Sequence, residues 1–350
     1  MADSGLTASA ASMRAQAGGS PSNKTHTETP MRRDTFLKSL AALAAAGSWP
    51  LTGHASGAPM KMMIPANPGG GWDTTGRAIG KALQDAGLAS SVQYENKGGA
   101  AGALGLAQFV NASKGDPNAL MVMGAVMLGG IITGKPPVSL SQATPIARLI
   151  SEYNVYVVHG ASPIKSMKDV IEQLKKDPGS VKWGGGSRGS TEHIAAAMIA
   201  REVGVDAAKI NYVPFRGGGE ATAAILGGNV TVGGSGFSEF QPYLESGKMR
   251  ALAVTSPQRI KGLDAPTLKE LGISVEIGNW RGVYAPPGIT PEQRKALTDK
   301  VVQATKSKSW AESLEKNGWT PALLAGPQFD EFVDREFAAL RAIMVKSGMI

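Results

Sequence analysis

The sequence predicts an α/β protein with mainly parallel sheets and helices on both faces. From Pro59 onward, short apolar segments typical of buried strands alternate with longer amphipathic segments typical of helices. Glycine clusters stand between these segments, with 45 glycines among 350 residues, and no internal repeat is visible. Because the alternation continues to the C-terminus, we expect two lobes.

Each element follows from the apolar pattern and from local start and stop signals. The expected strands cover residues 60–64, 92–95, 120–123, 155–158, 181–184, 210–213, 230–232, 250–254 and 280–285, and the first four of them are expected to be buried. The expected helices cover residues 74–86, 166–174, 191–203, 220–226, 240–245, a segment starting at 290, 309–316 and 328–346. Asp169 stands three residues after Ser166, which predicts a capping box, and Pro291 suits the first turn of its helix.

The composition excludes several kinds of site. The chain has no cysteine, which rules out disulfides, thiolate metal sites and cysteine nucleophiles. No histidine stands at a metal-ligand spacing from other ligands, so we expect neither a metal nor a cofactor. The net charge of +8 comes without a dense Lys/Arg run, which favours a small anion or an acidic partner surface over nucleic acid.

Residues 1–56 are predicted to be a leader with a signal peptide. Arg32 and Arg33 begin the signal, residues 39–46 are apolar, and small residues up to Ala55 suit cleavage. The apolar run is too short to span a bilayer. The sequence therefore predicts a periplasmic protein, exported by the Sec or the twin-arginine route, with translation starting at Met1 or Met31.

The first candidate site is the glycine-rich loop after the first strand. Three glycines open the backbone at the start of a helix, where free N–H groups and the helix dipole attract anions. Asp73 is expected to cap this helix and to pair with Arg77, four residues on. The candidate ligand-binding residues of this loop are Gly70, Gly71, Trp72, Asp73 and Thr74.

The second candidate site is the loop at residues 184–191, which fits two enzyme patterns incompletely. The dinucleotide pattern lacks the acidic residue expected after the next strand. The serine hydrolase pattern around Ser187 lacks a late histidine, because His193 is the last histidine in the chain. A serine hydrolase using Ser187 remains an alternative to a nest of N–H groups and hydroxyls. The candidate ligand-binding residues here are Gly186, Ser187, Gly189, Ser190 and Thr191.

Two further arginines stand beside glycines. Arg216 and Gly217 follow another strand, and Arg216 is either a ligand clamp or a solvated charge. Arg281 is likewise either a ligand clamp or a solvated charge. For Trp280, a structural packing role is favoured. Because no set of catalytic residues is complete, we expect a binding protein and not an enzyme.

These motifs in combination resemble the substrate-binding receptors of tripartite tricarboxylate transporters, also called the Bug receptor family, and its tricarboxylate-type branch. The matching segments are residues 68–73, 95–102, 116–120, 212–218, 250–254 and 280–288. The resemblance implies a type-2 periplasmic binding protein, with residues 59–158 and 280–350 in lobe one and residues 159–279 in lobe two. It implies a small carboxylate ligand, such as citrate or a related di- or aromatic carboxylate, in the cleft between the lobes.

The resemblance also implies partners. A monomeric receptor would deliver its ligand to an integral-membrane permease with one large and one small subunit, and a periplasmic sensor for a signalling kinase is the other alternative. Many relatives have a Val-Asp pair where this chain has residues 230–236, rich in glycine and serine. We expect the Gly/Ser part of this segment, residues 233–236, to form a loop that changes ligand selectivity.

Overall fold

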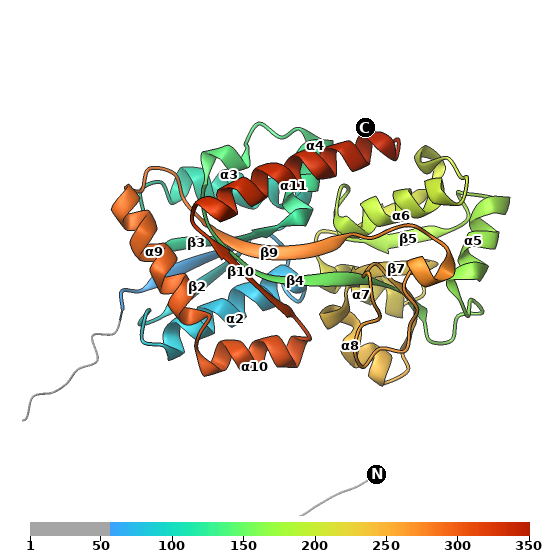
Figure 1. Cartoon of the computed structure of the whole chain (residues 1–350), viewed down its shortest axis with the longest axis horizontal. Helices are drawn as coiled ribbons and strands as arrows, with labels where there is room; N and C mark the ends of the chain where they lie inside the picture. Colours follow the sequence, from blue (N-terminus) through green and yellow to red (C-terminus); the bar gives the residue numbers. More distant parts are fainter. Residues whose placement is uncertain (1–56) are drawn as a thin grey trace, which may run out of the picture. The chain divides into compact units, whose positions relative to one another are not determined.

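The computed structural model describes residues 57–350, so the predicted leader and signal peptide lie outside the described residues. The strands are β1 (Met60–Ile64), β2 (Val92–Asn96), β3 (Ala119–Gly124), β4 (Thr144–His159), β5 (Lys182–Gly185), β6 (Asn211–Pro214), β7 (Val232–Gly236), β8 (Met249–Val254), β9 (Gly278–Ala285) and β10 (Thr320–Ala325). The helices are α2 (Gly71–Asp85), α3 (Ala103–Ala112), α4 (Ala125–Gly134), α5 (Met167–Lys176), α6 (Thr191–Glu202), α7 (Gly218–Leu226), α8 (Phe237–Glu245), α9 (Pro291–Ala304), α10 (Lys308–Asn317) and α11 (Pro327–Lys346). The predicted α/β class is confirmed (Figure 1).

The strands form one continuous arrangement in the order β2-β1-β3-β9-β4-β7-β5-β6, with β8 and β10 also paired to β4. Pairing is parallel among β1, β2 and β3 and among β5, β6 and β7. The pairs made by β4 and β9 are antiparallel, which the alternation of strands and helices did not predict. β4 and β9 therefore run side by side and connect the two parallel groups (Figure 1).

β4 is much longer than the predicted strand at residues 155–158. Its first part pairs with β9 and β10, and its last part pairs with β7 and β8. The sequence prediction found only the last part of β4, which is a continuous apolar run. In the first part of β4, buried residues are interrupted by polar and half-buried ones, so no apolar run is visible there. The two parallel groups belong to one compact unit of the chain. The division into lobes at residues 158/159 and 279/280 stays a prediction.

Several boundaries differ from the predicted ones. α2 begins at Gly71, three residues before the predicted start, because residues 71–73 are already helical and Gly70 is the N-cap. α3, α4 and β10 were not predicted. β2 lies at the end of the strand order and alternates half-buried with exposed residues, so the prediction of a buried strand there is wrong. The predicted capping box of Ser166 and Asp169 is confirmed at the start of α5.

The expected loop at residues 233–236 is wrong, because these residues form most of β7, which is buried. Its backbone pairs with β4, where Gly233 lies opposite Val157 and Ser235 opposite Val155. A side chain on Gly233 would collide with Ile225 of α7. The glycines therefore let neighbouring elements pack against the strand backbone.

Trp280 has the packing role that the sequence favoured. It is buried, and its ring packs edge-on against Phe329 and Phe332 of α11, with centroids 5.9 and 5.1 Å away. Its indole nitrogen donates a hydrogen bond to Glu336 at 3.1 Å. Because side chains alternate along a strand, Arg281 points to the opposite face of β9.

Candidate ligand-binding pocket

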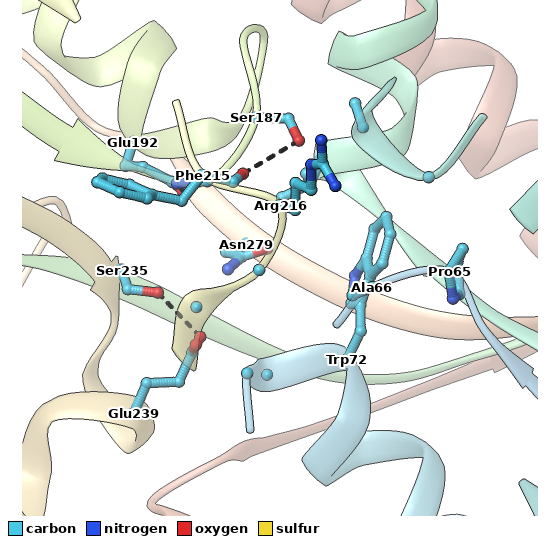
Figure 2. Close-up of a pocket in the computed structure, with 18 of the residues that line it drawn as sticks. Pro65, Ala66, Trp72, Ser187, Glu192, Phe215, Arg216, Ser235, Glu239 and Asn279 are labelled. Atoms are coloured by element: carbon cyan, nitrogen blue, oxygen red, sulfur yellow. Dashed lines mark hydrogen bonds between the residues drawn. The ribbon is translucent and has the colours of Figure 1, made fainter. Parts of the chain in front are cut away.

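The loops that follow β1, β5 and β6 line a single pocket (Figure 2). The lining contains seven of the candidate residues: Gly70, Gly71, Trp72, Gly186, Ser187, Arg216 and Gly217. Loops that follow parallel strands meet at the carboxyl edge of a sheet, which is where open α/β proteins hold ligands. The structure therefore brings together the two glycine-rich segments on which the sequence prediction depended.

The remaining candidates do not line this pocket. They are Asp73, Thr74, Gly189, Ser190 and Thr191. The Thr74 hydroxyl donates to the carbonyl of Gly70 at 3.2 Å, and the hydrogen bonds of the other four residues are described below. Their predicted direct contact with a ligand stays a prediction.

Asp73 is not the N-cap of α2, which corrects the sequence prediction. The N-cap is Gly70, and Asp73 lies in the first turn of the helix. Its carboxylate accepts hydrogen bonds from the backbone N–H of Gly69 at 3.1 Å, from Arg77 at 3.0 Å and from Asn96 at 3.0 Å. The predicted pairing of Asp73 with Arg77 is thus confirmed. Burial alone raises the pKa of Asp73, but these hydrogen bonds outweigh burial and leave that pKa below its ordinary value.

Trp72 forms part of the pocket wall and is buried. Its ring lies against Gly102, which has a left-handed φ of +92° in the short 3-10 helix η1 (Ala100–Gly102). A Cβ atom at Gly102 would lie 2.9 Å from the Trp72 ring. The segment at 99–102 therefore needs glycine both for its backbone conformation and for contact with Trp72.

The loop before α6 is held by its own side chains. The Ser190 side chain caps the helix, accepting from the N–H of His193 at 3.4 Å, and lies 3.0 Å from the hydroxyl of Tyr212. The N–H of Gly189 donates to His193 Nδ1 at 3.0 Å. Gly189 has a φ of +83°, a conformation that favours glycine. These contacts leave Gly186 and Ser187 at the pocket surface.

Ser187 and His193 do not form a nucleophile and base. The Ser187 hydroxyl donates to the carbonyl of Phe215 at 3.4 Å, and within residues 57–350 no hydrogen bond joins Ser187 to His193. His193 is stacked on Tyr212, with ring centroids 4.0 Å apart. Burial, together with the positive charge of Arg188, lowers the pKa of His193 to about 4. The geometry gives the hydrolase alternative no support.

The structure adds a buried ion-pair cluster that sequence reasoning missed. Arg281, only 2% exposed, pairs with Glu152 of β4 and with Glu239 of α8, the latter at 3.2 Å. Glu239 also accepts a hydrogen bond from Ser235 at 2.9 Å. Of these residues, Ser235, Glu239 and Arg281 line the pocket, together with Asn279.

Glu192 is a second missed acid in the pocket wall. It lies in the first turn of α6 and is buried. Its carboxylate accepts hydrogen bonds from the N–H of Gly186 and from the hydroxyl of Thr191, at 2.5 and 3.1 Å. Burial raises the pKa of Glu192, and burial likewise raises the pKa of Glu152.

Little in the sequence indicated that Arg281, Glu152 and Glu239 form a buried cluster. Strand alternation beside a packed Trp280 indicates that Arg281 faces the other side of β9, but it does not show what Arg281 meets there. Glu152, Glu239 and Arg281 come from three distant segments, and only the folded chain brings them together.

Arg216 lies at the pocket wall and is exposed. Its backbone N–H donates to Glu220 at 3.1 Å, and Glu220 also contacts Asn67 of the first loop. A Cβ on Gly70 would lie 2.7 Å from the nitrogen of Gly218. The first loop and the start of α7 are therefore in close contact beside the pocket.

Within residues 57–350, no helix has the length and apolar character required to cross a bilayer. Among the same residues, no three acidic or histidine side chains gather as a metal site would require.

Comparison with solved structures shows the fold of the protein. The periplasmic binding protein BugD matches 83% of this chain and 98% of its own, with a TM-score of 0.74 and 23% identity. The malate-bound MatC of Rhodopseudomonas palustris matches 82% of this chain and 98% of its own, with a TM-score of 0.72 and 22% identity. R. palustris Rpa4515 with adipate matches 86% of this chain and 99% of its own, with a TM-score of 0.74 and 23% identity. The fold is that of a periplasmic binding protein, as predicted.

The family follows from sequence comparison. The family described as "Tripartite tricarboxylate transporter family receptor" matches residues 77–349. BugT of Bordetella pertussis is 28% identical over 295 residues, which cover 83% of this chain and 89% of BugT. The chain belongs to the tripartite tricarboxylate transporter receptor family, which confirms the family that the motifs predicted.

Proposed function

We propose that this protein is a periplasmic receptor that binds a small carboxylate and delivers it to the membrane permease of a tripartite transporter. The observation that carries this proposal is the meeting of the loops after β1, β5 and β6 in one pocket, beside the first turns of α2 and α7. Those turns offer free backbone N–H groups and the positive ends of two helix dipoles.

The pocket suits an anionic group at its outer side. Arg216 supplies a cation, and Ser187 supplies a hydroxyl close by (Figure 2). Charge-assisted hydrogen bonds contribute roughly 1.5–3 kcal/mol each, so a few of them suffice for micromolar binding. Binding of malate and adipate by the structural neighbours agrees with a carboxylate ligand for this chain.

Delivery requires a change of shape that a permease can recognise. We infer that lobe one (59–158 and 280–350) and lobe two (159–279) close on the ligand about β4 and β9, which pair with each other and join the two parallel groups of strands. The monomeric closed form would then dock on the large and small permease subunits.

Calorimetry with the purified protein tests ligand binding. The panel is citrate, malate, adipate and an aromatic carboxylate, and we expect micromolar binding of at least one. Arg216→Gln should weaken that binding roughly tenfold, since it removes one charge-assisted contact. Lys168→Gln, an exposed change on α5, is the matched control and should bind as the parent does.

Two results would contradict the receptor proposal. One is the absence of binding to every carboxylate tested, and the other is equal affinity in the parent and the Arg216→Gln variant. Uptake of the identified ligand by cells with and without this protein then tests delivery. A sensor would bind the same ligand and leave uptake unchanged.

A further inference from the structure

The charges around the pocket are unusual for a site that takes a multiply charged anion. Two guanidinium groups, Arg216 and Arg281, face three carboxylates, Glu152, Glu192 and Glu239. With all five ionised, the sum of two positive and three negative charges is −1. These five side chains therefore offer no net positive charge to a trianion such as citrate.

Arg281 is not available to offset an added anion. Its side chain is 2% exposed and is already shared between Glu152 and Glu239, whose side chains are 3% and 7% exposed. A Cβ on Gly71 would collide with its guanidinium, so the start of α2 also covers it. Arg216 therefore remains as the cation that a ligand carboxylate can approach from the pocket.

The inner wall of the pocket has acceptors that lack donors. Glu239 Oε2 and Asn279 Oδ1 are buried, and among the described residues neither has a hydrogen-bond partner. Asn279 as a whole is 4% exposed. Glu239 Oε2 lies at the junction of the first loop and α7, next to Gly70 and Gly218. A buried acceptor without a donor is costly, and a ligand N–H group that entered here would remove that cost.

Arg216, the cation that a ligand can approach, and the acids of the pocket lie on different sides. Figure 2 shows Glu192, Ser235 and Glu239 on one side, and Arg216 with Trp72 on the other. Ser187 lies on the side of Arg216. Such an arrangement complements a molecule with a positive group at one end and a negative group at the other.

We propose that the ligand is an amino-carboxylate, with its protonated amine toward Glu239, Glu192 and Asn279 and its carboxylate toward Arg216 and Ser187. This proposal rests on the receptor function above and specifies the ligand class. Glu239 and Glu192 are then the residues that determine specificity. The apolar part of the ligand lies between Trp72 and Phe215, which are both in the pocket lining.

The test compares ligands that differ only by the amine. Calorimetry measures the affinity of the purified protein for glutamate against glutarate and for aspartate against succinate. We expect the amino member of at least one pair to bind roughly tenfold more tightly or better, as one charge-assisted hydrogen bond implies. Glu239→Gln should lower that ratio about tenfold and Glu192→Gln should also lower it. Glu172→Gln, on the exposed face of α5, should leave it unchanged.

The ratio is measured within each variant, so it does not depend on how much of the variant is folded. If glutarate and succinate bind as tightly as their amino partners, the amino-carboxylate proposal is wrong while the receptor function stands. An unchanged ratio in both glutamine variants would also overturn it. If no carboxylate binds at all, both proposals fail.

Discussion

Asp73 shows how one side chain shapes a binding loop without lining the pocket. Its carboxylate ties the loop backbone at Gly69 to Arg77 on α2 and to Asn96 at the end of β2. Asp73 is 6% exposed, so its carboxylate depends on these donors in place of water. The adjacent Gly70, Gly71 and Trp72 are thereby held at the pocket surface.

The change Asp73→Ala should therefore loosen the loop. We expect the free energy of unfolding to fall by about 1–3 kcal/mol and ligand affinity to weaken several-fold, because three hydrogen bonds are lost. Urea unfolding and calorimetry measure the two effects. Asp85→Ala on the same helix is the control, since Asp85 pairs with Lys81 in a solvent-exposed position and should matter little. A large gain in affinity on changing Asp73 would contradict this role.

Two acidic side chains, Glu192 and Glu239, determine the charge of the inner part of the pocket. Glu192 is buried, the Glu239 side chain is 7% exposed, and Arg281, which pairs with Glu239, is shared with Glu152. Their placement gives the pocket a negative inner wall and a positive outer side. On our proposal, that polarity favours an amino-carboxylate over a plain di- or tricarboxylate.

At the scale of elements, β7 is a strand built mostly without side chains. Its sequence from Val232 to Gly236 has the composition of a loop, yet every residue in it is buried. Tyr156 of β4 and Glu192 of α6 lie close to Gly234, where a Cβ would be 3.0 Å from each. Because Gly234 has no side chain, the pocket residue Glu192 can pack directly on the backbone of β7.

We expect Gly233→Ala to destabilise the protein by roughly 1–3 kcal/mol, because the new Cβ overlaps Ile225 of α7 in a close-packed region. Thermal and urea unfolding measure this. Gly134→Ala is the matched control, since a Cβ there meets nothing within 4 Å at the end of α4. It should be neutral or slightly stabilising, through the higher helix propensity of alanine. Equal stability of the Gly233→Ala and Gly134→Ala variants would refute the packing explanation.

At the scale of the whole molecule, β4 and β9 make the described chain one fold. β9 pairs with β3 of the first parallel group, β4 pairs with β7 of the second, and β4 and β9 pair with each other. β4 alone pairs with four other strands. Any process that unfolds the second group exposes the end of β4. Buried groups in that region therefore affect the stability of the entire fold.

His193 should make that stability depend on pH. Its pKa is about 4 in the folded chain and 6.5 as its ordinary value, so between these values the unfolded chain binds a proton that the folded chain does not. Stability is then full above the ordinary pKa and falls as the pH falls toward the folded pKa. Urea unfolding near pH 7.5 and near pH 5 should differ by about 2 kcal/mol from this residue.

The variant His193→Gln isolates the contribution, because the acidic residues titrate in both proteins. We expect the parent to lose more stability than the variant between the two pH values. The same loss in both proteins would show that His193 takes no part.

The sequence by itself determined the α/β class, the family and the principal pocket loops. Each depends on local features: apolar periodicity, glycines that open the backbone after a strand, and motifs in a fixed order. Gly70, Gly71, Gly186, Ser187 and Arg216 could be predicted for this reason, since strand ends place such loops at one edge of a sheet.

Only the tertiary structure decided the charges inside the pocket. Arg281, Glu152 and Glu239 lie on separate elements, and their meeting depends on the antiparallel pairing of β4 with β9 and on the position of α8. Likewise, the burial of β7 depends on how closely Ile225 and Tyr156 approach its backbone. Contacts between distant segments leave no local pattern in the chain, and they set the distribution of charge in the pocket.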